Sequence, residues 1–114
     1  MITPVPKPRQ TVADRWKKRP CVMRYRAFAD ELRELVDLEK IKDIRQIRLI
    51  FVMPMAKSWS RKKKFTMFAT PHQQRPDIDN LVKSVMDALL PEDMSVWRLY
   101  AEKRWGEVGS IEIS

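Results

Sequence analysis

The chain has 114 residues, 44% hydrophobic and 33% charged, and this composition predicts one globular domain over residues 1–114. Its net charge of +8 indicates a polyanionic partner, either nucleic acid or an anionic membrane surface. No apolar run approaches the roughly 20 residues of a membrane-spanning helix. The single cysteine excludes an internal disulfide, and the two glycines exclude a glycine-rich phosphate loop. We therefore expect a cytoplasmic protein that does not enter membranes.

The positive charge is concentrated in two segments. The N-terminal arm, residues 1–26, contains eight Lys or Arg residues against Asp14 alone, and the basic segment, residues 57–64, contains five and no acid. From Asp77 to residue 114, eight acidic residues face four basic ones. A plain solvated surface would mix the two signs, so we interpret the chain as two basic arms around an acidic centre.

The N-terminal arm begins with a proline-rich stretch, and such stretches keep a backbone extended and break helices. We expect Ile2–Val5 to form a short edge strand and Lys7–Arg19 to form a basic loop. A frayed terminus is the plain alternative. Trp16 lies among basic residues, and because an aromatic ring can stack on a base, its position favours a nucleic-acid-binding arm.

Three segments follow in order. An apolar stripe at helical spacing predicts a core-packing helix over residues 24–40. The β-branched and aromatic run 46–53 predicts a central strand that Pro54 ends. Residues 56–75 are expected to form a long loop or loose hairpin. Its basic run, residues 61–64, is flanked by aromatic residues, which favours contact with a phosphate backbone over a merely solvated run of charge.

A second helix is predicted from residue 79 until Leu90-Pro91 ends it. Its core face comprises Leu81, Val82, Val85, Met86 and Leu89, and its polar face comprises Asn80, Lys83, Ser84 and Asp87. Residues 96–105 and 110–114 predict two closing strands, the first with Trp97, Leu99, Ala101, Lys103 and Trp105 on one side. The expected fold is α+β, a two-layer sandwich of two main helices on a small mixed sheet, in the order β-α-β-loop-α-β-β.

The candidate chemistry is a D-x-D, Asp77 and Asp79, directly before this helix. In an extended segment, which Pro76 favours, alternate side chains share one side, so the two carboxylates would lie together. Mg²⁺ and Mn²⁺ prefer oxygen ligands, and a metal ion there would polarise a scissile phosphate and activate water. Lys83, one turn along, would stabilise the charge that develops in the transition state.

A purely structural alternative accounts for the same residues. Asp79 would be a helix N-cap, Asp77 would be incidental, and Lys83 would pair with Asp87 on a solvated helix face. A D-x-D by itself is too short a motif to exclude this alternative. His72 has no partner at metal-ligand spacing, so we do not expect it to bind metal.

A longer pattern favours the metal site. The run R-P-D-I-D-N-L-V-K-S-V-M-D-A-L followed by E-D-x-S is very similar to the signature of the RusA family of Holliday-junction resolvases, which is common in phages and prophages. The run P-V-P-K-P-R and the closing strands also resemble that family. The resemblance implies that Asp77 and Asp79 bind metal and that Lys83 is the essential lysine. Asn80 and Asp87 match residues that recur in the motif.

The resemblance also implies how the protein acts. It implies a homodimer that places two active sites across four-way junction DNA, in the host cytoplasm at the nucleoid. Each site would make a Mg²⁺-dependent nick that leaves 5′-phosphate and 3′-hydroxyl ends.

One position departs from the family pattern. The acidic loop of the family usually reads E-D-D-S, and its second aspartate is the remaining carboxylate of the site, whereas this loop reads Glu92-Asp93-Met94-Ser95. A thioether is a poor ligand for a hard cation. We expect Asp93 to act as the third metal ligand and catalytic carboxylate, with Asp87 as the alternative.

These observations predict a Mg²⁺-dependent junction endonuclease, with Mn²⁺ as a possible substitute. The residues expected to contact DNA are mainly basic: Lys7, Arg9, Lys17, Lys18, Arg19, Lys62, Lys63, Lys64, Arg75 and Asn80. Two alternatives stay open. One is a junction-binding protein of the same fold in which Met94 has weakened or abolished cleavage. The other is a basic single-strand nucleic-acid-binding module whose acidic helix face is structural.

Overall fold

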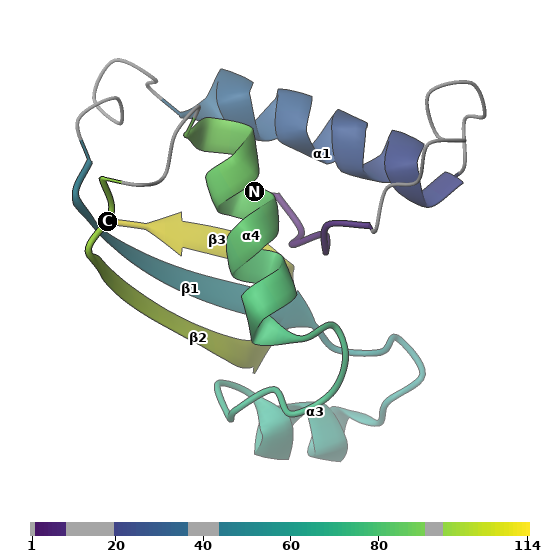
Figure 1. Cartoon of the computed structure of the whole chain (residues 1–114). Coiled ribbons are helices and arrows are strands. Elements are labelled where there is room, and N and C mark those ends of the chain that lie inside the picture. Colours follow the sequence, from purple (N-terminus) through teal and green to yellow (C-terminus); the bar gives the residue numbers. More distant parts are fainter. Residues whose placement is uncertain (1, 9–19, 37–43, 91–94) are drawn as a thin grey trace.

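A computed structural model describes residues 2–8, 20–36, 44–90 and 95–114. In this part of the chain, three helices and a three-stranded mixed sheet form an α+β fold, as predicted (Figure 1). The helices are α1 (Pro20–Leu35), α3 (Arg61–Met67) and α4 (Ile78–Leu89), and the strands are β1 (Gln46–Pro54), β2 (Arg98–Gly106) and β3 (Ser110–Ile113). Within these ranges, no helix combines the length and apolar character needed to cross a membrane.

The strand β1 is the central strand, as its β-branched and aromatic sequence predicted. The sheet order is β2-β1-β3, with β2 parallel and β3 antiparallel to β1. The register pairs Leu49 with Ala101, and Phe51 with Lys103. Paired residues share a face of the sheet. Ala101 and Lys103 of β2 therefore lie on the same face as Leu49 and Phe51 of β1, which belong to the core.

One long helix covers this face, and the other packs against that helix. The helix α4 lies across the sheet, and α1 packs against α4 (Figure 1). Both helices bury an apolar stripe, with Leu81, Val85 and Leu89 from α4 meeting Tyr25, Phe28 and Leu32 from α1 in one core. The predicted core face of α4 is therefore confirmed, and the polar side of α4 is left for the candidate site.

The prediction of a strand at Ile2–Val5 was wrong. Residues 2–8 have no regular structure, although Ile2 and Pro4 are buried. Prolines in this stretch carry no backbone N–H and cannot donate to a strand ladder. The segment is held by packing instead, since a Cβ atom on Gly109 would come within 2.6 Å of the Thr3 hydroxyl oxygen.

The segment predicted as a loop, residues 56–75, contains the helix α3. The Ser60 side chain caps α3 by accepting the backbone N–H of Lys63 at 3.1 Å. None of its seven residues is buried, so there was no apolar stripe by which the sequence could reveal it. The prediction of two main helices therefore missed one element.

The boundaries of two further elements also differ from the prediction. The helix α1 begins at Pro20, because proline suits the first helical turn, and ends at Leu35. Both closing strands are present, but they flank β1 on opposite sides and do not pair with each other.

Candidate active site

A groove between α4 and β2 gathers the polar residues of the acidic centre. This α4–β2 groove has a volume of about 560 Å³. It is lined by Asp79, Lys83 and Asp87 together with Ile78, Val82, Met86, Leu99 and Ala101. These three residues, spaced i, i+4 and i+8 along the helix, thus share one face of α4. The groove places three ionisable side chains above an apolar floor.

The D-x-D lies at the start of α4. Asp77 is the N-cap residue, with the extended backbone that the sequence predicted (φ −67°, ψ 145°), and its side chain makes no capping hydrogen bond. The prediction that the extended segment continues to Asp79 was wrong, because α4 begins at Ile78, so strand alternation does not place the two carboxylates on one side. Asp79 lies in the first turn, where its Oδ1 accepts the backbone N–H of Asn80 at 2.8 Å. The alternative in which Asp79 is the helix N-cap is therefore wrong. Both carboxylates are exposed and available to a ligand.

The polar face of α4 is narrower than predicted. Lys83 is exposed, but Ser84 is fully buried, with 0% of its surface accessible. The Ser84 hydroxyl donates to the backbone carbonyl of Leu81 at 2.8 Å, so burial leaves no unsatisfied polar group. A small hydroxyl that bonds within its own helix can lie in the core, and this corrects the prediction for Ser84.

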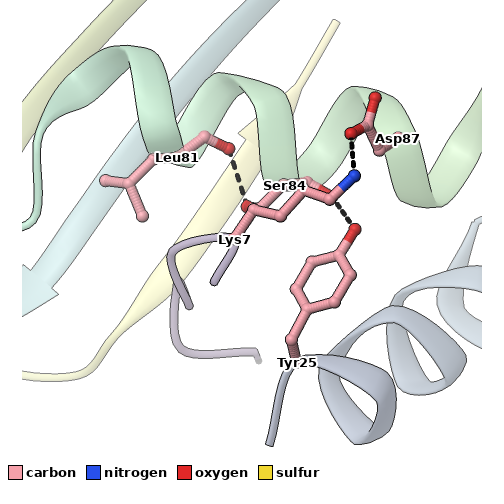
Figure 2. A network of polar contacts seen from close by, with 5 residues as sticks. All are labelled: Lys7, Tyr25, Leu81, Ser84 and Asp87. Carbon is pink, nitrogen blue, oxygen red and sulfur yellow. Dashed lines mark hydrogen bonds and ion pairs between the residues drawn. The ribbon is translucent and has the colours of Figure 1, made fainter. Parts of the chain in front are cut away.

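Asp87 is held by the N-terminal segment. Its carboxylate forms an ion pair with the Lys7 ammonium, and both side chains are partly buried. Figure 2 shows the Lys7 ammonium directed at Asp87. The alternative in which Lys83 pairs with Asp87 does not match this arrangement. Lys7, predicted to contact DNA, thus lies beside the groove and neutralises the Asp87 carboxylate.

A buried tyrosine supports the same part of α4. The Tyr25 hydroxyl donates to the Ser84 carbonyl at 3.0 Å, and the Lys7 ammonium lies 5.9 Å from the Tyr25 ring (Figure 2). Burial raises the pKa of Tyr25, and the Asp87 carboxylate acts in the same direction against the opposing Lys7 ammonium. The hydroxyl thus stays protonated and keeps donating. No sequence pattern indicated this role, because the bond joins residues 59 positions apart.

The backbone just before Asp77 is fixed by Lys103 of β2. The Lys103 ammonium donates to the carbonyl of Gln74 at 2.8 Å and to the carbonyl of Pro76 at 2.7 Å. These bonds hold the approach to Asp77 against the sheet. Sequence reasoning placed Lys103 only on a strand face, because a contact of 27 residues' separation has no local signature.

His72 anchors the start of the same approach. Its backbone N–H donates to the Lys103 carbonyl at 3.0 Å, and its ring lies 4.3 Å from the Trp105 ring. The side chain is buried, and its Nδ1 has no hydrogen-bond partner among the described residues. Burial lowers the pKa of His72, with the Lys103 charge acting in the same direction. These contacts give His72 a packing role.

A comparison with protein families shows which family the chain belongs to. The sequence model described as endodeoxyribonuclease RusA matches residues 2–114. The chain belongs to the RusA endodeoxyribonuclease family. Membership implies an endonuclease that resolves Holliday junctions, and RusA nucleases are generally metal-dependent. No curated protein and no solved structure gives a significant match to the chain.

The RusA-family acidic loop falls on residues the structure does not describe. Asp93, Met94 and Glu92 all lie in the range 91–94. Within the described ranges, no three His, Cys, Asp or Glu side chains come close enough to hold a metal ion. Of the residues predicted to bind metal, the structure thus describes Asp77 and Asp79, and it brings Asp79 together with Lys83 in the α4–β2 groove.

Besides Lys7, the residues predicted to contact DNA fall in three groups. Lys62 and Lys63 are exposed on α3, and Lys64 is partly buried there. Arg75 and Asn80 are exposed on either side of the D-x-D. Four others lie outside the described residues: Arg9, Lys17, Lys18 and Arg19. In sequence, the described cations thus precede the acidic centre, on α3 and in the loop before Asp77.

Proposed function

We propose that this RusA-family protein is a Mg²⁺-dependent, structure-selective endonuclease. It resolves Holliday junctions by paired symmetric nicks, with 5′-phosphate products, during DNA recombination and repair. The supporting observation is the α4–β2 groove, where Asp79 and Lys83 lie one helical turn apart on a helix whose other side is in the core.

The donor set at the start of α4 fits a hard divalent cation. Asp77 and Asp79 supply exposed carboxylate oxygens two residues apart, and Mg²⁺ is usually bound by one or two carboxylates plus water and substrate phosphate. We assign Asp93 as the third carboxylate. When bound, the ion supplies Lewis-acid activation of the phosphodiester and of the attacking water.

The protein's own side chains supply position and charge. Lys83 faces the groove and would stabilise the negative charge that builds on the phosphodiester in the transition state. Lys103 holds the backbone before Asp77, so the first carboxylate keeps its place relative to α4. The cations of α3 would bind the DNA backbone next to the site.

Two paired nicks require two active sites, so we propose a homodimer with one site for each cleaved strand. Support for this comes from the family and from the two-fold symmetry of a four-way junction, since closed two-fold dimers are the commonest oligomers. Sedimentation of the full chain at micromolar concentration tests it.

The central experiment is a nicking assay on a synthetic four-way junction, with duplex and single-stranded DNA as comparison substrates. We expect Mg²⁺-dependent nicks in the junction alone, placed symmetrically on two strands. Equal cleavage of all three substrates would contradict structure selectivity. Preferential binding of single strands without any cleavage would favour a single-strand-binding module.

Met94 favours a second candidate, a junction-binding protein with weakened cleavage. A two-aspartate site binds Mg²⁺ less tightly, so cleavage would need unusually high Mg²⁺ or would favour Mn²⁺. Met94→Asp should then lower the metal concentration for half-maximal nicking, with Met94→Leu as the matched control. If both variants and the parent protein bind the junction but never nick it, the second candidate replaces the first.

A further inference from the structure

A second groove lies at α3, apart from the α4–β2 groove. This α3 groove has a volume of about 560 Å³. It is lined by Met55, Arg61, Lys64, Phe65, Phe68 and Glu107. Its floor is the buried, apolar Met55, and its sides carry two aromatic rings, two cations and the Glu107 carboxylate.

The two phenylalanines are unusual in their exposure. Phe65 is 88% exposed and Phe68 is 59% exposed, and no residue of α3 is buried. Large apolar side chains are normally withdrawn from water, since each buried Å² of apolar surface is worth roughly 25 cal/mol. Rings kept outside the core on such a short helix indicate a surface that a ligand covers.

The charge around these rings selects the ligand. Arg61 and Lys64 line the groove, and Lys62 and Lys63 lie beside them on α3. The same groove of a second copy is a poor partner for this surface, because a two-fold contact through it would oppose like charges. An aromatic surface within a cationic one matches a nucleobase with its phosphate, because a base presents a flat π-face and the backbone is anionic.

We propose that the α3 groove binds an unpaired nucleobase of the DNA substrate. The base would stack on Phe65 or Phe68 over the Met55 floor, while Arg61 and Lys64 neutralise the adjoining phosphates. This inference rests on the proposed function and adds a ligand class that the α4–β2 groove does not provide. A base at a branch point has lost continuous stacking and unpairs more readily than one in intact duplex, so such a contact would add structure selectivity.

The groove is fixed in place although α3 has no buried residue. The Lys63 ammonium lies 4.2 Å from the Trp59 ring, whose centroid is 4.8 Å from that of Trp105 on β2. The backbone N–H of Ala69 donates to the Trp105 carbonyl at 2.9 Å, and that of Trp105 donates to Thr70 at 3.0 Å. Both flanks of α3 are therefore attached to one end of β2.

The attachment connects the two grooves. From Thr70 the chain passes His72, bonded to Lys103, and reaches Pro76, which Lys103 also holds. A base in the α3 groove would thus fix its strand relative to Asp77. Binding of an unpaired base at α3 would therefore help to place a phosphodiester of the same strand at the acidic centre.

The test compares two DNA duplexes that differ in one group. One carries a single unpaired thymidine, and the other carries an abasic residue at that position. Binding is measured by fluorescence anisotropy at fixed salt without divalent metal. We expect the full-length protein to bind the thymidine duplex roughly tenfold or more tightly, since stacking on an aromatic side chain is sequence-tolerant and strong.

The variants assign that preference to the rings. Phe65→Ala/Phe68→Ala should bind both duplexes equally, and Phe65→Leu/Phe68→Leu, which keeps apolar bulk, should also lose most of the preference. Trp97→Ala is the matched control, because Trp97 is an exposed aromatic residue outside the groove. It should retain the preference. Unchanged thermal unfolding of all variants would show that folding is preserved.

Two results would overturn the inference. If the parent protein binds the two duplexes equally, or if the phenylalanine variants keep the preference, the groove does not hold a base. If the variants convert a dimer into monomers in sedimentation, the groove is a contact between copies. Neither result bears on junction nicking by the parent protein, which is measured separately. Loss of junction nicking and junction binding in the parent protein would instead refute the proposed function.

Discussion

The helices α4 and α3 lie close in sequence and differ in how the fold holds them. Six of the 12 residues of α4 are buried, and the helix packs on both the sheet and α1. None of the seven residues of α3 is buried, and its neighbours Trp59 and Ala69 attach it to Trp105. The carboxylates and Lys83 are thus on the rigid helix, while the exposed cations and rings are on the peripheral one. Catalytic groups need sub-ångström placement, whereas phosphate contacts tolerate more freedom.

The largest effect is expected at the start of α4. Asp79→Asn keeps the shape of the side chain but removes a negative charge that a divalent cation needs. Nicking should fall by about a hundredfold or more, since even indirect supports of a metal site cost 10–100-fold. Junction binding in the absence of metal should stay unchanged. Rapid nicking by Asp79→Asn at ordinary Mg²⁺ would remove Asp79 from the metal site.

The next effect is expected at Lys83, on the same helix. Lys83→Ala should lower kcat and kcat/KM together, by about a hundredfold, because the contact forms mainly in the transition state. Single-turnover nicking and anisotropy with the same junction separate the two steps. A variant that binds much more weakly yet cleaves normally at saturation would place Lys83 in the docking surface.

A stability measurement sharpens the comparison between the helices. Leu81 of α4 is fully buried, so Leu81→Ala should lower the free energy of unfolding by about 2–5 kcal/mol. Phe65→Ala removes a larger side chain from α3 but should change the free energy of unfolding by less than about 0.5 kcal/mol. Urea denaturation of both variants gives the two values. Similar losses would mean that α3 is anchored as firmly as α4.

The basic run should affect binding without affecting stability. Replacing Lys62, Lys63 and Lys64 by Ala should weaken binding to all branched DNA. It should also reduce the slope of log affinity against log salt concentration, by roughly 0.9 for each phosphate that the variant no longer neutralises. A variant with Arg45, Arg48 and Arg98 replaced by Ala removes the same charge from exposed positions outside both basic arms. An identical salt slope in both variants would show that the run is merely solvated.

The smallest effect is expected from His72, in the segment between the two helices. Because its pKa in the folded protein lies below the usual value near 6.5, the unfolded chain binds the proton more readily. The stabilisation from neutral His72 is therefore complete above about pH 6.5 and is lost as the pH falls below that value. Unfolding measured between pH 7.5 and 5.5 should show this fall. His72→Gln should show a shallower one, and equal slopes would contradict the assignment.

The sequence predicted the parts of the fold that have a strong local period. The core face of α4 and the central position of β1 follow from apolar spacing and β-branched composition, and both are confirmed. The helix α3 was missed because helix prediction relies on an apolar face, and its only local signal was the Ser60 cap. Ser84 was misplaced because spacing alone cannot show that a hydroxyl is satisfied by the carbonyl of Leu81.

The sequence predicted where two residues of the candidate site lie on α4, but not the contacts that support them. Asp79 and Lys83 could be placed on one face from helical spacing alone, and the groove confirms that placement. The bonds of Lys103 and the ion pair of Lys7 with Asp87 depend on how distant segments come together. No pattern of neighbouring residues encodes such contacts, so they required the structure.

The composition of the α4–β2 groove also sets when the groove can exist. One wall comes from residues 78–87, and the other comes from Leu99 and Ala101. The second wall is fixed only when β2 pairs with β1, in the register that places Arg98 opposite Gln46. During translation α4 leaves the ribosome before β2, so its polar face has no opposing wall until residues 98–106 have emerged. Any activity that depends on the groove therefore begins only after β2 has been synthesised and has joined the sheet.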